Sequence, residues 1–514
     1  MAARPKSCEF AGNGMDRECA RVHSGGLKRL ATMAAILVVV ATACNRGLPI
    51  IGKHSPSPKA ETAVVWTSCD DGFECGSLAV PLDYSHPQGD TIKIALIRKK
   101  ATDASKRIGS VLLNPGGPGA SGIDFLRMSA SGFSDLNKSF DLVSFDPRGV
   151  GASAPVRCLT GPQEDEFNAL DSVLDDPAEK AAGIQADKDF VAGCKAMSAK
   201  ILPFVDTPSV ARDMDRIDAA LGDRKLTYLG FSYGTYLGEW YAHLFPTHVR
   251  ALALDGVLDP AMSPNDLILA QVAGFQQNLE VFAADCKSKS SCQLGKNGDP
   301  VAEIQSFLNG LDTHPLQVGE RQLTRALALF GIGVTLYDTS GWPYLDQAMT
   351  AGLQGNGRLL LAFADLYLGR NANGTYDNES DSNVAVNCLD RPVATDVGSY
   401  DALGPAFAKA SPIFGPAFQY SNLICAYWPI AAKEPLGPLS ADGAPPILLV
   451  GATGDPVTPY ALAKAVNAEL SGSVLLTRQG YGHTSYNSSP CIQAAENAYL
   501  VQLTMPAAGT VCSS

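Results

Sequence analysis

The pentapeptide Gly-Phe-Ser-Tyr-Gly at residues 230–234 could supply a catalytic nucleophile. It lies between an apolar, strand-like segment and a helix-like segment, which is the setting of a nucleophile elbow with Ser232 exposed at the turn. Gly230 and Gly234 fit this interpretation because so tight a turn leaves no room for flanking side chains. The N-terminus of the following helix would also offer free N–H groups to an anion. Three fixed positions can match by chance, so the interpretation depends on finding partners for the serine.

A serine hydroxyl needs a general base within hydrogen-bond reach, and the base needs an orienting acid. In enzymes built on such an elbow, the acid and then the histidine follow the serine along the chain. Only one histidine lies late enough, in a glycine-rich segment after the strand-like residues 473–477, so we predict that His483 is the base. The histidines considered were His23, His54, His86, His243, His248, His314 and His483.

The acid should follow the preceding strand of the sheet. Residues 446–451 form a continuous apolar run typical of a buried parallel strand, and Asp455 comes shortly after it. Gly-Asp-Pro could also be an ordinary turn. Asp255 and Asp259, which follow the strand-like residues 249–254, are the competing acids. We predict that Asp455 is the acid.

An oxyanion formed at the serine needs two N–H donors. Tyr233, directly after the nucleophile, would supply one. The other is predicted at Gly117, with Gly116 as the alternative, in the glycine-rich loop 114–119 that follows an apolar strand; a simple turn is the competing interpretation. Arg148, in the turn after the next strand, is expected to pair with a structural carboxylate rather than to support the active-site loops.

The elements around these residues predict an α/β fold. Residues 64–259 alternate strands and helices, as a doubly wound, mostly parallel sheet does. Residues 260–444 break this rhythm with helical patterns and polar loops, which indicates a mostly helical cap inserted into the sheet domain. Residues 445–514 return to the sheet, carry the acid and the base, and end in a helix over 492–503.

Composition excludes some partners. The chain has 514 residues and a net charge of −12, without a basic patch, so we expect no nucleic-acid partner. It contains no C-x-x-C and no H-E-x-x-H motif, so we expect neither a metal nor another cofactor.

The N-terminus resembles an export signal. Basic residues precede a short apolar run over 30–43, which suits the hydrophobic region of a signal peptide better than a membrane span. Cys44 directly follows small residues, as in a bacterial lipobox, so we predict a signal peptide over 1–43, lipidation of Cys44 with membrane attachment, and a tether over 44–63. Ordinary cleavage after Ala43 and a retained anchor are the alternatives, and translation could start at Met15.

The cysteines agree with export. Ten remain after the leader, and an even count in an exported chain suggests disulfides. The sequence does not fix their connectivity. Pairing of neighbours along the chain is the simplest hypothesis, giving Cys69–Cys75, Cys158–Cys194, Cys286–Cys292, Cys388–Cys425 and Cys491–Cys512.

Several motifs together resemble one known family. They are Asn-Pro-Gly-Gly-Pro-Gly at 114–119, Asp-Pro-Arg-Gly-Val-Gly at 146–151, the elbow through Gly238, Leu-Asp-Gly-Val-Leu-Asp-Pro at 254–260, Asn-Cys-Leu-Asp at 387–390, Gly-Asp-Pro-Val-Thr-Pro at 454–459, and Gly-His at 482–483. The chain resembles the secreted, tripeptidyl-aminopeptidase-like serine hydrolases of the α/β-hydrolase fold, relatives of the prolyl aminopeptidases. Some members are described as mycobacterial-type envelope lipoproteins with protease or carboxylesterase activity.

The resemblance implies hydrolysis of a peptide from its free N-terminus, releasing amino acids or short peptides. Pro115 stands where prolyl aminopeptidases have histidine, so their narrow proline preference is not carried over. An exopeptidase must hold the substrate's ammonium group, and Asp390 is the predicted carboxylate, with a structural ion pair to Arg391 or another cation as the alternative. An esterase would use the same triad, and an inactive envelope binding lipoprotein is a rival of a different class.

Overall fold

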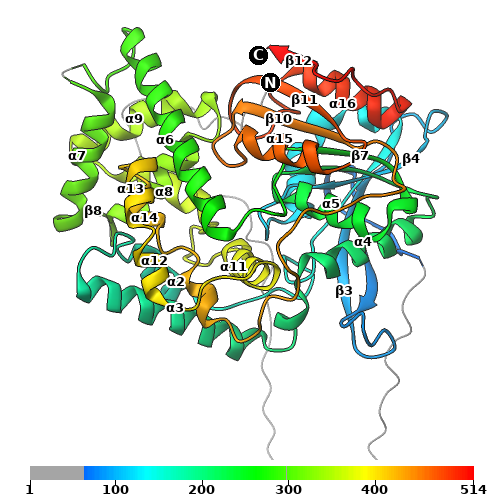
Figure 1. Ribbon diagram of the computed structural model, residues 1–514, viewed down its shortest axis with the longest axis horizontal. Helices are drawn as coiled ribbons and strands as arrows, with labels where there is room; N and C mark the ends of the chain where they lie inside the picture. The colour runs from blue at the N-terminus through cyan, green and yellow to red at the C-terminus, as the bar shows by residue number, and fades with distance from the viewer. Residues whose placement is uncertain (1–62, 297, 514) are drawn as a thin grey trace, which may run out of the picture. The chain divides into compact units, whose positions relative to one another are not determined.

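The computed structural model describes residues 63–296 and 298–513, and a ten-stranded sheet runs through this part of the chain. The strands lie in the order β1-β2-β3-β5-β4-β6-β7-β10-β11-β12 (Figure 1). Their bounds are β1 Thr67–Ser68, β2 Glu74–Pro81, β3 Thr91–Lys99, β4 Gly109–Asn114, β5 Phe140–Phe145, β6 Leu226–Phe231, β7 Val249–Asp255, β10 Leu448–Gly454, β11 Val474–Tyr481 and β12 Val511–Ser513.

The sheet is mostly parallel. β1, β2, β3 and β5 pair antiparallel in that order, and every pairing from β5 through β4 to β12 is parallel. The central strands β4, β5 and β6 are buried along their whole length, which explains why they are nearly continuous apolar runs rather than alternating patterns. The predicted α/β fold with a mostly parallel sheet is confirmed.

Helices cover both faces of the sheet. α4 (Thr207–Leu221), α5 (Tyr233–Leu244) and α15 (Tyr460–Glu469) share one apolar core with the sheet, whereas α1 (Gly122–Ser129) and α16 (Pro490–Gln502) share another. β4 contributes to both cores, because Leu112 belongs to the first and its neighbours Val111 and Leu113 belong to the second.

The segment between β7 and β10 is mostly helical and has a core of its own, which includes Leu279, Ile332 and Leu345. In Figure 1 its green and yellow helices gather beside the sheet, and the only strands among its described residues form one hairpin. The predicted limits of the cap, 260 and 444, remain a prediction. The elements are α6 Pro264–Ser288, α7 Pro300–Thr313, β8 Leu316–Val318, β9 Arg321–Leu323, α8 Arg325–Thr335, α9 Trp342–Leu353, α10 Arg358–Tyr367, α11 Glu379–Asp390, α12 Val397–Asp401, α13 Gly404–Ala410 and α14 Gly415–Phe418.

Two further helices, from the segment between β5 and α4, contact this helical region. They are α2 (Gly161–Ala169) and α3 (Pro177–Ser198). Arg370 Nε donates to Asp165 Oδ1 of α2 at 2.6 Å, and Lys180 Nζ of α3 donates to Asp401 Oδ1 at 2.8 Å. The buried residues of α3, including Phe190 and Cys194, belong to the apolar core that the sheet shares with α4 and α5, so α3 also packs with the sheet domain.

Arg148 has a structural role, as predicted. Its side chain is fully buried and forms a two-pronged ion pair with Asp213 of α4, with both N···O distances 2.7 Å. The remaining donors bind the carbonyl oxygens of Pro81, Leu82 and Phe204. Arg148 therefore joins the end of β2 to α4.

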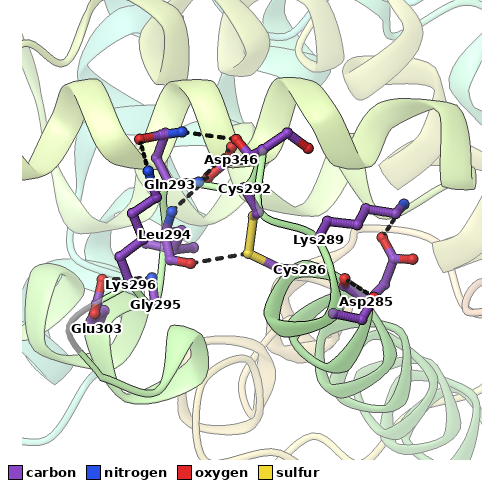
Figure 2. Close-up of a disulfide and its surroundings, with 12 residues drawn as sticks. Asp285, Cys286, Lys289, Cys292, Gln293, Leu294, Gly295, Lys296, Glu303 and Asp346 are labelled. Carbon is purple, nitrogen blue, oxygen red and sulfur yellow. Dashed lines mark hydrogen bonds and ion pairs between the residues drawn. A yellow bond between two sulfur atoms is a disulfide. The ribbon is translucent and has the colours of Figure 1, made fainter.

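Five disulfides connect the ten cysteines of the described chain, and all five agree with the neighbour pairing. Figure 2 shows Cys286–Cys292, where Asp346 accepts hydrogen bonds from the backbone N–H groups of Gln293 and Leu294. Asp346 lies close to both sulfur atoms. Because the disulfide consumes the thiolates that a metal would need, this cluster is not a metal site.

The predicted signal peptide, Cys44 and all but the last residue of the predicted tether lie outside the described residues. Among the residues that are described, none of the helices is both long and apolar enough to cross a membrane.

Candidate active site

Ser232 occupies a tight turn between β6 and α5. Its backbone has φ 55° and ψ −126°, a conformation that L-residues adopt rarely and that clusters at functional sites. A Cβ atom on Gly230 would lie 2.5 Å from the carbonyl oxygen of Gly234, and one on Gly234 would lie 2.8 Å from Asn114 Oδ1. The turn therefore has no room for side chains at its flanks, as the sequence predicted.

His483 and Asp455 form a hydrogen-bonded pair. His483 Nδ1 lies 3.0 Å from each carboxylate oxygen of Asp455. A neutral His483 in this arrangement carries its proton on Nδ1 and leaves Nε2 free to accept one. The backbone N–H of His483 donates to the carbonyl oxygen of Tyr337, at 2.7 Å, so the helical region also holds the histidine loop.

Asp455 is buried, and several donors stabilise its charge. Its Oδ1 accepts from the backbone N–H groups of Val457 and Thr458, and its Oδ2 accepts from the Thr458 hydroxyl at 2.9 Å and the Thr484 N–H at 3.2 Å. Burial alone would raise the pKa of Asp455. The charge of His483 and these hydrogen bonds outweigh burial, so the pKa lies below its usual value and the carboxylate is ionised at neutral pH.

Asp255 and Asp259, the competing acids, make other contacts. Asp255 Oδ2 accepts hydrogen bonds from the backbone N–H groups of Ser485 and Tyr486, at 2.7 and 2.8 Å, and its carbonyl oxygen accepts one from Ser232 N–H at 2.9 Å. Asp255 therefore joins the nucleophile turn to the histidine loop. Asp259 Oδ1 accepts from the backbone N–H of Ala261.

The other histidines of the described chain are engaged elsewhere. His86 bonds to Asp83, His243 to the carbonyl oxygen of Ser440, His248 to Asp215, and His314 to Thr313. His23 and His54 lie outside the described residues.

The turn, the acid and the base meet at one edge of the sheet. Ser232, Asp455 and His483 follow β6, β10 and β11, which are parallel, so their carboxyl ends share an edge. A Cβ atom on Gly256 would lie 3.5 Å from His483 Cε1, which places the imidazole beside the strand end that binds Ser232. The Ser232 hydroxyl makes no hydrogen bond to residues 63–296 or 298–513, and such contacts often tighten only when substrate binds.

Two N–H groups beside Ser232 are available to an oxyanion. The loop after β4 lies against the elbow, since a Cβ atom on Gly116 would be 3.0 Å from Tyr233 N. Gly116 N–H already donates to Asn114 Oδ1 at 3.0 Å, whereas the N–H groups of Gly117 and Tyr233 have no partner within the described chain. Gly117 and Tyr233 also line a cavity with Ser232. This geometry favours Gly117 over Gly116 as the second donor.

The cavity has a volume of about 320 Å³ and lies between the sheet domain and the helical region. Most of its wall is apolar, with contributions from Leu267, Phe275 and Phe330. Asn383 and Asn387 of α11 and Arg391 provide polar groups. A pocket of this size and character suits the acyl part of a small organic or peptide substrate.

Comparison with known proteins identifies the family. Residues 109–327 match the family described as alpha/beta hydrolase fold, and residues 411–512 match the family described as TAP-like protein. The chain is 36% identical over 520 residues to serine protease Hip1 of Mycobacterium tuberculosis, an alignment that covers 95% of this chain and 98% of the relative. The chain belongs to the TAP-like α/β-hydrolases.

Other relatives carry different activity names. Carboxylesterase B of Mycobacterium tuberculosis is 35% identical, with 90% of this chain and 93% of the relative covered. A tripeptidyl aminopeptidase of Streptomyces lividans is 31% identical, with 88% of this chain and 87% of the relative covered. TAP-like relatives therefore include enzymes named for peptide and for ester hydrolysis.

Asp390 has surroundings unlike those of an ammonium site. It is buried outside the cavity lining, and its two carboxylate oxygens accept from the N–H and the hydroxyl of Thr207. The Thr207 hydroxyl also bonds to the phenol of Tyr233. Arg391, the expected alternative partner, instead donates to backbone carbonyl oxygens. In this TAP-like chain the structural alternative is thus the better interpretation of Asp390, with Thr207 rather than a cation as its partner.

Sequence reasoning missed three residues of the site. Thr458 and the positioning role of Asp255 depend on hydrogen bonds that no motif reveals. Glu379, at the start of α11, has its carboxylate close to Gly117, since a Cβ atom on that glycine would lie 3.5 Å from Glu379 Oε1. Its only signal in the sequence was its spacing of four and eight residues from Asn383 and Asn387, which places all three on one face of a helix.

Proposed function

We propose that this chain is a serine exopeptidase that releases amino acids or short peptides from free N-termini. The observation that carries the proposal is the His483–Asp455 pair at the same sheet edge as the strained Ser232, beside a cavity that Ser232 lines. Relatives named serine protease and tripeptidyl aminopeptidase support peptide hydrolysis as the reaction.

Each residue has a defined step in the proposed mechanism. Ser232 attacks the scissile carbonyl while His483 Nε2 takes its proton, and Asp455 stabilises the imidazolium that forms. The N–H groups of Gly117 and Tyr233 bind the oxyanion. His483 then protonates the leaving amine, and water, activated by the same histidine, hydrolyses the acyl-enzyme and restores the Ser232 hydroxyl.

Glu379 is the carboxylate that we assign to the substrate's ammonium group, in place of Asp390. Its side chain is exposed and has no hydrogen-bond or ion-pair partner in the described chain, and it lies close to Gly117. The surrounding protein desolvates the carboxylate and raises its pKa to about 7. An ammonium group in contact with it would stabilise the ionised form.

The test is turnover of fluorogenic amides of one, two or three residues, each with a free or an acetylated N-terminus. We expect cleavage of free-amine substrates that is lost on acetylation and absent in Ser232→Ala. Glu379→Gln should reduce the free-amine preference by about 10-fold or more, the loss of one charge-assisted contact. The matched control is Glu320→Gln, which removes an exposed carboxylate from the β8–β9 hairpin, outside the cavity wall. Equal rates on free and acetylated substrates would contradict the exopeptidase proposal.

Ester hydrolysis is the second candidate function. The mostly apolar cavity and the relative named carboxylesterase B favour it. The same triad would act, so the catalytic residues do not separate the two activities. Turnover of short or long acyl esters, without turnover of any amide, would select this alternative and leave Glu379 without an assigned role.

We also propose that the protein is exported and held at the outer face of the cell membrane through lipidated Cys44. The five disulfides support export, because such bonds persist in oxidising compartments. Mass spectrometry of the mature N-terminus tests this assignment. A diacylglyceryl-modified Cys44 is expected, and an unmodified N-terminus after Ala43 would show simple secretion.

A further inference from the structure

Arg391 brings a positive charge to the wall of the catalytic cavity. It follows the last residue of α11, its side chain is buried, and it lines the same cavity as Ser232. Every other residue that forms the described wall is uncharged. A lone guanidinium in an otherwise neutral, mostly apolar pocket is costly to bury unless something compensates its charge.

The described chain supplies hydrogen-bond acceptors for only some of the N–H groups of Arg391. Arg391 Nη1 donates to the carbonyl oxygen of Met262 at 3.2 Å, and Nη2 donates to that of Asp259 at 3.5 Å, which is at the long limit of a hydrogen bond. A guanidinium has five N–H donors, so most of them have no partner in the described chain. The guanidinium packs over the ring of Tyr236, 4.9 Å from its centroid, which fixes its position.

The acids near Arg391 are committed elsewhere. Arg391 forms no ion pair with any described carboxylate. Asp390 accepts from Thr207, and the Asp259 carboxylate accepts from Ala261 N–H. Glu239 of α5 is fully enclosed, burial raises its pKa well above the usual value, and its carboxylate makes no ion pair with Arg391. Within residues 63–296 and 298–513, no carboxylate therefore neutralises the guanidinium in direct contact.

We propose that Arg391 forms an anion subsite, which accepts the carboxylate of an acidic side chain in the acyl part of the substrate. This inference rests on the proposed hydrolase function and adds a preference for Glu or Asp. Free guanidinium N–H groups match a carboxylate in a two-pronged geometry. Tyr236, which holds Arg391, lies one helical turn from Ser232, about 6 Å along α5. Because Ser232 and Arg391 line the same cavity, an acidic side chain among the three residues before the scissile bond would reach the guanidinium.

The experiment compares kcat/KM for free-amine tripeptidyl amides that differ at one position only, carrying Glu, Gln or Lys at the first, second or third residue from the scissile bond. A charge-assisted contact predicts that Glu exceeds Gln by about 10- to 100-fold at one of these positions, with Lys below both. Arg391→Gln should bring the Glu-to-Gln ratio near one, and Arg391→Lys should keep part of it. The ratio is independent of the fraction of folded enzyme.

Arg157→Gln is the matched control, because Arg157 also donates to backbone carbonyl oxygens next to α11, those of Tyr376 and Asp377, but lies outside the cavity wall. It should leave the Glu-to-Gln ratio unchanged. Equal kcat/KM for Glu and Gln at all three positions, or a Glu preference that persists in Arg391→Gln, would overturn the proposal and leave Arg391 as an anchor for the start of α6.

Failure of the peptidase proposal is distinguishable from failure of the subsite. If no amide is cleaved above the Ser232→Ala blank, the same comparison is made with acyl esters whose chain ends in a carboxylate or in the isosteric amide. Preference for the carboxylate, lost in Arg391→Gln, would support the subsite in an esterase. Equal rates would refute it.

Discussion

Replacement of Asp255 by asparagine should change how the stability of the protein depends on pH. Relative to the unmodified protein, the variant should be more stable at neutral pH than at acid pH. Asp255 is fully buried, and burial raises its pKa from 3.8 to about 6, while the hydrogen bonds from Ser485 and Tyr486 oppose this increase. Between these two values the folded chain binds more protons at Asp255 than the unfolded chain does. The stability of the unmodified protein therefore falls as the pH rises through this window.

The size of the effect follows from the two pKa values. A difference from 3.8 to about 6 corresponds to about 3 kcal/mol, since each pKa unit is worth about 1.4 kcal/mol. Asparagine keeps an oxygen that can accept from Ser485 and Tyr486 but never ionises. The free energy of unfolding of Asp255→Asn minus that of the unmodified protein should thus increase by about 3 kcal/mol between pH 3.5 and pH 7, by the same linkage.

Urea unfolding followed by tryptophan fluorescence, with the disulfides intact, measures this difference at several pH values. Packing changes that are independent of pH cancel in the comparison. Activity is a second readout, because Asp255 joins the nucleophile turn to the histidine loop and a shifted loop would lower kcat. A stability difference that stays constant from pH 3.5 to 7 would refute the reasoning, because Asp255 would then have an ordinary pKa.

Three other substitutions test separate parts of the structure. Thr458→Val removes a 2.9 Å hydrogen bond to Asp455 and should lower kcat/KM by about 10- to 100-fold, whereas Thr458→Ser should retain most activity; equal activity of the two would contradict the role of the hydroxyl. Arg148→Met leaves the buried carboxylate of Asp213 without its ion-pair partner and should destabilise the fold by about 3–5 kcal/mol in thermal unfolding. A loss below about 1 kcal/mol would contradict the structural role of this ion pair. Serine at both Cys388 and Cys425 opens a disulfide with a sequence separation of 37, so denaturant unfolding should show a loss of up to about 4 kcal/mol, while an unchanged midpoint would argue against this cross-link.

The sequence predicted the fold, and it singled out the residues that we propose as catalytic, because both depend on local patterns. Apolar runs marked β4, β5, β6, β7, β10 and β11 to within a few residues, since strands buried on both faces are mostly apolar. Chain order and elimination then singled out His483 among seven histidines, and the structure places it against Asp455. Parallel strands end at one edge of the sheet, so residues far apart in the sequence had to meet there.

Features that depend on tertiary contacts could not be predicted. The contacts of α2 and α3 with the helical region involve partners such as Asp401, far along the chain. Asp390 carries the carboxylate that an ammonium site needs, but no sequence pattern reveals that this carboxylate bonds to Thr207, which is distant along the chain. Glu379 stood in a polar stretch that resembled a loop, and only the fold of α11 brings it to Gly117.

The most direct test of the central claim is covalent trapping of the nucleophile. The purified mature chain is treated with a fluorophosphonate, and the modified peptide is located by mass spectrometry. The proposed mechanism predicts one adduct, on Ser232, with labelling abolished in Ser232→Ala and strongly slowed in His483→Ala, because the base must activate the hydroxyl. No adduct on the folded protein, or an adduct on another residue that persists in Ser232→Ala, would contradict the account.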